Sequence, residues 1–527
     1  MMTNRVAFEM GRLDEARRGY DEILAAEQTT SFAEVHFAAL YDRGRIAQRQ
    51  GNREEAIGFF ARAIDALEAQ RASIGQDRYK LGFVENRLAV YDDMVLAQVS
   101  AGRADAAFEY AERAKARALV DLLADRTSFG GSAKPDRERL RTALTTLKAL
   151  EARPIQVARA DTAGDDATRG LTIEGIRQEI RTETGELASL VSVETVSAGD
   201  IRANLSDREV LVEYFQAGDR LIAFVVTGRR LEAVDLDGRG LAEAVAAFRT
   251  ALQDKTSDAW QAQAKALYDR LLRPIEDRLD APLLTVVPQG PLNYLPFAAL
   301  HDGRGVVADR LAVRVLPSAS VLKYLRLRGP AANRALLALG NPDVGDASRD
   351  LPGAEVETQA IAARWPSARR LVRANASETL FKENGGTFGY LHLASHGEFD
   401  PENPLESGLL LAPDARNDGR LTVSEIYELE LDAELITLSA CETALGDLAG
   451  GDEVVGLTRG FLYAGARSVV ASLWQVSDNA TAELMERFYE ELKRNTPAEA
   501  LRRAQLDTKR AFKHPYYWAA FQLNGNG

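Results

Sequence analysis

Two short apolar runs, each followed by a reactive side chain, constrain the fold of this chain more than any other feature. The run at 388–394 ends just before His396, and the run at 435–438 ends just before Cys441. Each run has the length and composition of a buried strand. Parallel neighbouring strands end on the same edge of a sheet, where open α/β sheets carry their sites. We therefore expect the imidazole and the thiol to lie close together.

The segment between the two runs is long enough for a crossover connection, because Cys441 follows His396 by 45 positions. It contains a hairpin candidate at 409–412 and a helix candidate at 421–429. A thiol beside an imidazole is the minimum requirement for a cysteine nucleophile with its base. The two runs together thus predict a catalytic pair on one sheet edge.

Composition excludes several classes of protein. The 527 residues are 46% hydrophobic and carry a net charge of −13, which offers no electrostatic footprint for nucleic acid or anionic lipid. No window approaches 18 consecutive apolar residues, so no transmembrane helix is expected. The first residues lack the apolar core of a signal peptide. The single cysteine permits no intramolecular disulfide and fits a reducing cytoplasm.

The motifs around these residues extend well beyond one cysteine and one histidine. They read HLASHGEF at 392–399, LSACETA at 438–444 and GGDEVVGLTRGFLYAGARSVVASLWQVSD at 450–478. In this order they resemble the CHAT domain of the caspase, separase and gingipain clan, over roughly residues 210–523. The resemblance implies an α/β caspase-like fold with a non-catalytic half at 201–333 and a catalytic half at 334–527.

The resemblance also implies roles for individual residues. Cys441 would be the nucleophile, and His396 would protonate the leaving amine. The oxyanion hole would be formed by the backbone N–H groups of Gly397 and Cys441, and a glycine lets a substrate carbonyl approach the backbone. The sequence gives no signal for a third residue that orients the histidine.

Specificity is less clearly indicated. By resemblance, Asp478 helps to bind a basic P1 side chain, which predicts cleavage after Lys or Arg. Gln475 stands where separase-like proteases often have Asp, which weakens that analogy. Asp478 is equally consistent with the N-cap of the helix that follows it.

Structural interpretations of these residues compete with the catalytic interpretation. In isolation, Cys441 would be a small buried hydrophobe at a strand end. His392 falls within the apolar run and is predicted to be a core histidine. Ser439 lies in no G-x-S-x-G elbow. The sequence contains no phosphate-binding loop and no zinc motif, so we expect neither metal nor cofactor.

The N-terminal part contains a repeated pattern. Gly11, Gly51 and Gly102 each precede a similar segment with alanines at matching positions. The pattern resembles tetratricopeptide repeats, whose glycines turn between paired helices. The glycines are 40 and 51 positions apart, whereas that repeat usually has about 34 residues, so we expect longer or irregular helices. The first repeat lacks a full leading helix, which suggests that the chain starts inside an array.

We therefore predict four parts: a tetratricopeptide-like helical array at 1–127, a helical connector at 128–200, and the two CHAT halves. The predicted function is a cytoplasmic cysteine endopeptidase, held latent until the array binds a protein activator or substrate. The resemblance further implies a link to bacterial antiviral defence, where CHAT proteases activate gasdermins or act with RNA-guided complexes. The competing hypothesis is an inactive interaction scaffold, against which the presence of both His396 and Cys441 argues.

Overall fold

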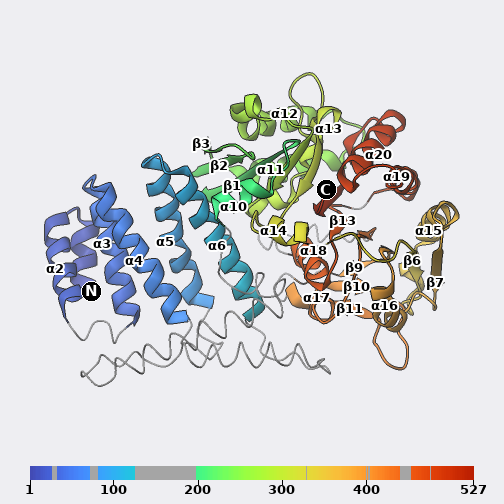
Figure 1. Cartoon of the computed structure of the whole chain (residues 1–527), viewed down its shortest axis with the longest axis horizontal. Helices are drawn as coiled ribbons and strands as arrows, with labels where there is room; N and C mark the ends of the chain where they lie inside the picture. The colour runs from blue at the N-terminus through green and yellow to red at the C-terminus, as the bar shows by residue number, and fades with distance from the viewer. Residues whose placement is uncertain are drawn as a thin grey trace. The chain divides into compact units, whose positions relative to one another are not determined.

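The computed structural model describes residues 1–26, 33–71, 81–124, 197–327, 329–398, 400, 404–439, 453–474 and 476–527 (Figure 1). These residues divide into two compact units, 1–198 and 199–527. The first unit is helical, and the second is an α/β domain built on a mixed β-sheet, as the sequence predicts. Among the described helices, none is both long and apolar enough to cross a membrane.

The first unit contains three helix pairs within the described residues. They are α1 (Met2–Glu9) with α2 (Leu13–Ala25), α3 (Ala33–Arg49) with α4 (Arg53–Arg71), and α5 (Leu81–Ser100) with α6 (Ala104–Ala124). The leading helix of the first pair is the shortest, as predicted. Most of the predicted connector, 125–196, lies outside the described residues.

The three predicted turn glycines end the leading helices in the same way. Gly11, Gly51 and Gly102 have φ angles of 75°, 81° and 74°. At the middle turn, Gly51 N–H donates to Gln48 O and Asn52 N–H donates to Ala47 O, and both other turns repeat this pair of bonds. This is the Schellman motif, which requires a left-handed residue after the helix. A Cβ at these glycines would meet no atom within 4 Å, so the requirement is one of backbone conformation.

Small and aromatic side chains at matching positions pack the helices together. Ala16, Ala56 and Ala107 are all buried, as the repeat pattern predicts. Arg43 on α3 is also buried and joins three helices, since its guanidinium lies 2.7 Å from Asp21 on α2 and 2.6 Å from Glu55 on α4. Close packing of the small side chains and the ion pairs of Arg43 together stabilise the array.

The second unit is built on one large sheet, which has eleven strands within the described residues, in the order β3-β2-β1-β4-β5-β14-β13-β12-β8-β6-β7. Its strands are β1 (Glu209–Ala217), β2 (Arg220–Val226), β3 (Leu231–Asp237), β4 (Leu283–Val287), β5 (Ala312–Val315), β6 (Leu336–Pro342), β7 (Ala368–Arg373), β8 (Tyr390–Ala394), β12 (Leu435–Leu438), β13 (Ser468–Ser472) and β14 (Phe521–Gly525).

The helices of this unit lie between the strands in sequence. They are α10 (Ala198–Asn204), α11 (Leu241–Gln253), α12 (Ala259–Leu271), α13 (Val307–Arg310), α14 (Val321–Leu327), α15 (Pro352–Arg364), α16 (Glu378–Asn384), α17 (Val423–Ile426), α18 (Glu453–Ala464), α19 (Asp478–Glu491) and α20 (Pro497–Ala511). Short 3₁₀ turns complete the described elements: η3 (Arg273–Arg278), η4 (Gly290–Tyr294), η5 (Phe297–Ala299), η6 (Ala347–Arg349), η7 (Gly385–Thr387), η8 (Pro404–Glu406) and η10 (Pro515–Tyr517).

The two predicted halves meet edge to edge in this sheet. Strands β1–β5 come from the first half and β6–β14 from the second, and the halves join where β5 pairs with β14 through Val315 and Asn524. A buried ion pair lies close to the junction: Arg314 on β5 pairs with Glu209 on β1 and donates to Gly525 O on β14 at 3.1 Å. Burying both charges is tolerable because each is paired and hydrogen-bonded.

The crossover between β8 and β12 contains a second, small sheet. Its order is β11-β10-β9, with β9 (Gly397–Glu398), β10 (Gly408–Leu410) and β11 (Arg420–Thr422). The predicted hairpin is therefore present, but the helix predicted at 421–429 is wrong in extent. Its first two residues belong to β11, and α17 begins only after Thr422, whose side chain forms a capping box with Glu425.

We expect Gly51→Ala to destabilise the array by about 1 kcal/mol, because alanine resists the left-handed conformation. The measurement is the urea dependence of hydrogen exchange in α3 and α4. The control is Gly58→Ala, at an exposed helix position with open space around it, which should stabilise the array by about 1 kcal/mol. Equal effects of the two substitutions would contradict the Schellman assignment.

The array should also gain stability in mild acid. Burial, with the adjacent charge of Asp93, raises the pKa of Asp92 to about 6. The folded state therefore favours the protonated form, and this stabilisation is complete below the unfolded pKa of about 3.9 and lost as the pH rises through 6. Asp92→Asn should increase the exchange protection of α5 at pH 7, after correction for intrinsic rates, whereas exposed Asp65→Asn should not. A variant less protected than the wild type at pH 7 would refute this prediction.

Candidate active site

The strand pair predicted from the sequence is present. Strands β8 and β12 are parallel neighbours, with His392 opposite Thr437 and Leu393 opposite Leu438. The ladder continues one step further, because Ser439 N–H donates to Leu393 O at 2.9 Å. Every residue of both strands is buried, which explains their continuous apolar sequence. The carboxyl ends of the two strands therefore lie side by side.

The predicted catalytic residues differ in how far the structure describes them. His396 follows the end of β8 by two positions and is partly exposed. Cys441 follows Ser439 by two positions and lies outside the described residues, as does Gln475. The backbone of Asp478 begins α19, but its side chain lies outside the described part. The N-cap position belongs to Ser477, so the alternative assignment of Asp478 as N-cap is wrong by one residue.

A backbone carbonyl orients the ring of His396. Nε2 lies 2.9 Å from Arg349 O, and a carbonyl can only accept a hydrogen bond. Nε2 therefore carries the proton, and Nδ1 remains as the basic nitrogen of the neutral ring. The sequence could not reveal this partner, because any residue type supplies a carbonyl and Arg349 is 47 positions upstream.

The segment that carries Arg349 is held by side chains at both of its ends. Asp346 accepts the N–H of Ser348 at 2.9 Å and so starts the turn η6. The guanidinium of Arg349 donates to Glu398 at 2.6 Å, two residues beyond His396. Arg349 thus contacts the histidine segment twice, through its carbonyl to His396 and through its guanidinium to Glu398.

Asn341, at the end of β6, holds the residues that follow Arg349. It has a φ angle of 48°, a conformation that asparagine tolerates better than most residues. Its amide donates to Asp350 at 2.9 Å and to Glu355 at 3.0 Å, while its oxygen accepts the N–H of Leu351 at 2.8 Å. The hydrogen bond from Asn341, assisted by Arg373, lowers the pKa of Asp350.

The register of β9 determines the direction of the Gly397 backbone. Leu410 N–H donates to His396 O at 2.9 Å, and Leu409 lies opposite Gly397. Adjacent pairs in an antiparallel ladder alternate between bonded and non-bonded. Gly397 therefore belongs to a non-bonded pair, and its N–H points away from β10. Because β9 is the edge strand of the small sheet within the described residues, this N–H takes no part in the ladder of that sheet.

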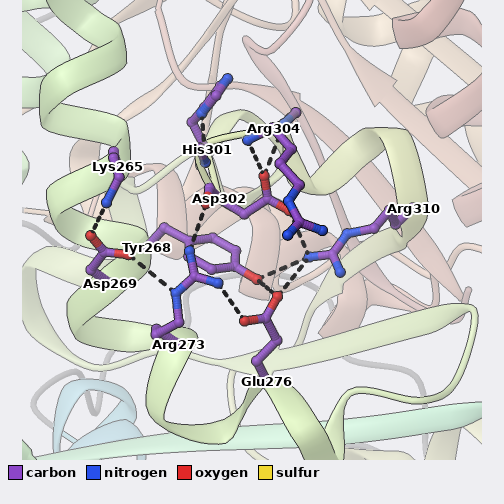
Figure 2. A network of polar contacts seen from close by, with 11 residues as sticks. Lys265, Tyr268, Asp269, Arg273, Glu276, His301, Asp302, Arg304 and Arg310 are labelled. Carbon is purple, nitrogen blue, oxygen red and sulfur yellow. Dashed lines mark hydrogen bonds and ion pairs between the residues drawn. The ribbon is translucent and has the colours of Figure 1, made fainter.

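Two other histidines of this unit, His301 and His392, have structural contacts. His392 is fully buried within β8, as predicted. His301 lies in a glycine-rich turn beside a polar network of the first half (Figure 2). Its Nδ1 accepts the N–H of Gly303 at 3.0 Å, and the neighbouring Asp302 O accepts a bond from Arg273 at 2.6 Å. Figure 2 shows Arg273 and Arg310 converging on Glu276, a surface network that stabilises the turn.

Comparison with known proteins identifies the family. Residues 261–526 match the CHAT domain family. The chain belongs to the CHAT family. Tetratricopeptide repeat protein 28 is 26% identical to it over 323 residues in Homo sapiens and over 322 residues in Mus musculus. Each match covers 50% of this chain and 13% of the relative, so the matched region is a small part of those proteins.

Solved structures of the Saccharomyces cerevisiae separase–securin complex align with the chain at low similarity. Two of them, at 3.0 and 2.6 Å resolution, have TM-scores of 0.47 and 0.43 and identities of 11% and 12%. Each alignment covers 100% of this CHAT protein and 46% of the solved chain.

We expect Asn341→Ala to loosen the segment that presents the Arg349 carbonyl. The variant loses three hydrogen bonds and forces alanine into a positive φ, which together should cost about 2–4 kcal/mol. Hydrogen exchange at 343–351 should become faster than in the wild type. Gly345→Ala, at a positive φ in the same loop but with open space around it, is the control and should have a smaller effect. Unchanged exchange in Asn341→Ala would show that other contacts hold the segment.

Proposed function

We propose that this CHAT protein is a cysteine endopeptidase with Cys441 as nucleophile and His396 as its acid–base partner. The observation that carries the proposal is the parallel pairing of β8 with β12, whose carboxyl ends lie at the same sheet edge and precede His396 and Cys441 in the sequence. Membership of the CHAT family and the oriented imidazole of His396 support it.

The chemistry would proceed through a thioester. The thiolate of Cys441 attacks the substrate carbonyl carbon, the C–N bond breaks, and the protonated His396 gives its proton to the leaving amine. Water then attacks the thioester while His396 takes up one of its protons, the C–S bond breaks, and the acyl group leaves as a carboxylic acid, which restores the thiolate of Cys441 and the protonated His396. The Arg349 carbonyl would accept from Nε2 throughout, so that Nδ1 is the atom that exchanges protons.

The oxyanion that forms during each attack needs hydrogen-bond donors. The N–H of Gly397 is a suitable donor because the register of β9 turns it away from β10 and leaves it out of the ladder. The N–H of Cys441 is the second donor in this proposal. Removing one such donor typically slows catalysis by roughly 10²–10³-fold.

Specificity and regulation complete the proposal. Asp478 would favour Lys or Arg at P1, by resemblance to separase-like proteases. The helical array would bind a protein activator or substrate, as repeat surfaces commonly do, and peptide cleavage would remain low until then. The cytoplasmic location is proposed from the single cysteine, and a role in bacterial defence from the resemblance alone.

The direct test compares the wild type, Cys441→Ala and His396→Ala with a library of short peptides that carry a fluorescent leaving group. We expect cleavage by the wild type alone, at the low rate of the protein without its activator, with loss of at least about 10³-fold in each variant and a preference for basic P1 residues. Equal cleavage after neutral residues would refute the role of Asp478. Cleavage that survives in Cys441→Ala would refute the nucleophile.

A further inference from the structure

A buried polar cluster lies beneath the paired ends of β8 and β12. His392 and Thr437 are opposite each other in the ladder, and both are fully buried. The hydroxyl of Tyr489 on α19 joins them, because it lies 3.1 Å from Nδ1 of His392 and donates to Oγ1 of Thr437 at 3.0 Å. One phenol thus ties together the two strands that lead to the proposed catalytic pair.

Glu357 on α15 makes a second connection between the same strands. Its Oε1 lies 3.0 Å from Nε2 of His392 on β8. Its Oε2 accepts a hydrogen bond from the hydroxyl of Ser439 at 3.1 Å, just beyond the end of β12. Only 4% of Glu357 is exposed. The carboxylate therefore spans the distance between the two strands close to their carboxyl ends.

Tyr489 determines the hydrogen-bond roles around His392. Burial raises the pKa of Tyr489, so its hydroxyl stays protonated and can donate to Thr437. Nδ1 of His392 must then donate to the tyrosine oxygen. Without a further proton, Nε2 and Oε1 would be two bare acceptors 3.0 Å apart, which would repel each other.

The arrangement is poor as a purely stabilising device. The contact between Nε2 and Oε1 is close but not aligned as a hydrogen bond, and neither atom has another hydrogen-bond partner among the described residues. A partly satisfied buried polar cluster is less stable than an apolar core of the same shape. The neighbouring side chains on this face, Trp365 and Tyr390, are aromatic and would accommodate apolar residues. The cluster thus has a stability cost that an apolar core would avoid.

We propose that Glu357 is a positioning residue that fixes the ends of β8 and β12 relative to each other through His392 and Ser439. This inference rests on the proposed function, because the strand ends lead directly to His396 and Cys441. Ser439 precedes Cys441 by two residues, and His392 precedes His396 by four. A displacement of about 1 Å between catalytic groups can slow a reaction by roughly 10²-fold. Glu357 acts from behind the sheet and does not touch the substrate.

The test uses the single cysteine of the full chain. Its rate of alkylation by iodoacetamide, followed by intact mass, reports Cys441 alone. A thiolate promoted by His396 should react faster near pH 6.5 than a free thiol with a pKa of about 8.5. We expect Glu357→Gln and Ser439→Ala each to slow this reaction about 10-fold and to shift its pH midpoint upward. The double variant should be no slower than Glu357→Gln, and Ser439→Thr, which keeps the hydroxyl, should retain the wild-type profile.

A control separates positioning from loss of stability. Tyr214→Phe removes a buried hydroxyl that donates to Leu271 O at 3.1 Å in the other half of the sheet. It should lower the melting temperature without changing alkylation. If His396→Ala slows alkylation but Glu357→Gln and Ser439→Ala do not, the positioning role is refuted and the proposed function stands. If His396→Ala itself has no effect, both are refuted. Ser439→Ala remains informative even if Glu357→Gln does not fold.

Discussion

The parallel pairing of β8 with β12 is the interaction on which the rest of the proposed site depends. A one-residue shift in this ladder would turn every side chain of one strand to the opposite face. His392 and Thr437 would then no longer share a face with Tyr489, and the side chain of Ser439 would leave Glu357. The register is therefore fixed twice: by apolar burial along both strands and by polar contacts that only one register allows.

The surrounding structure keeps this pair of strands in a rigid setting. The first half extends the same sheet across the β5–β14 junction, so it supports the second half by backbone pairing and not only by side-chain packing. The small sheet β9–β11 holds the segment after His396, and the segment around Arg349 holds its ring. The histidine is thus restrained in two ways, through its backbone by the small sheet and through its ring by a carbonyl 47 positions upstream.

The sequence predicted the features that depend on local pattern. The two buried strands, the crossover between them and the glycine turns of the array all follow from periodicity or from a backbone requirement, and all are present. The orienting carbonyl of Arg349 and the anchoring role of Asn341 were not predictable, because a backbone oxygen has no sequence signal and an isolated asparagine has many uses. The helix at 421–429 was wrong because Leu421 continues an alternating strand before Thr422 caps the helix. The roles of Cys441, Gly397 and Asp478 stay predictions.

The central claim is that Cys441 and His396 act together as a catalytic pair. The most direct measurement is intact mass spectrometry of the full chain after incubation with a peptidyl acyloxymethyl ketone that carries a basic P1 residue. Such a ketone reacts with a thiol that an active site has activated. We predict one covalent adduct, located at Cys441, that forms in the wild type and is largely lost in His396→Ala. Labelling of the wild type that is no faster than labelling of His396→Ala or of denatured protein would contradict it.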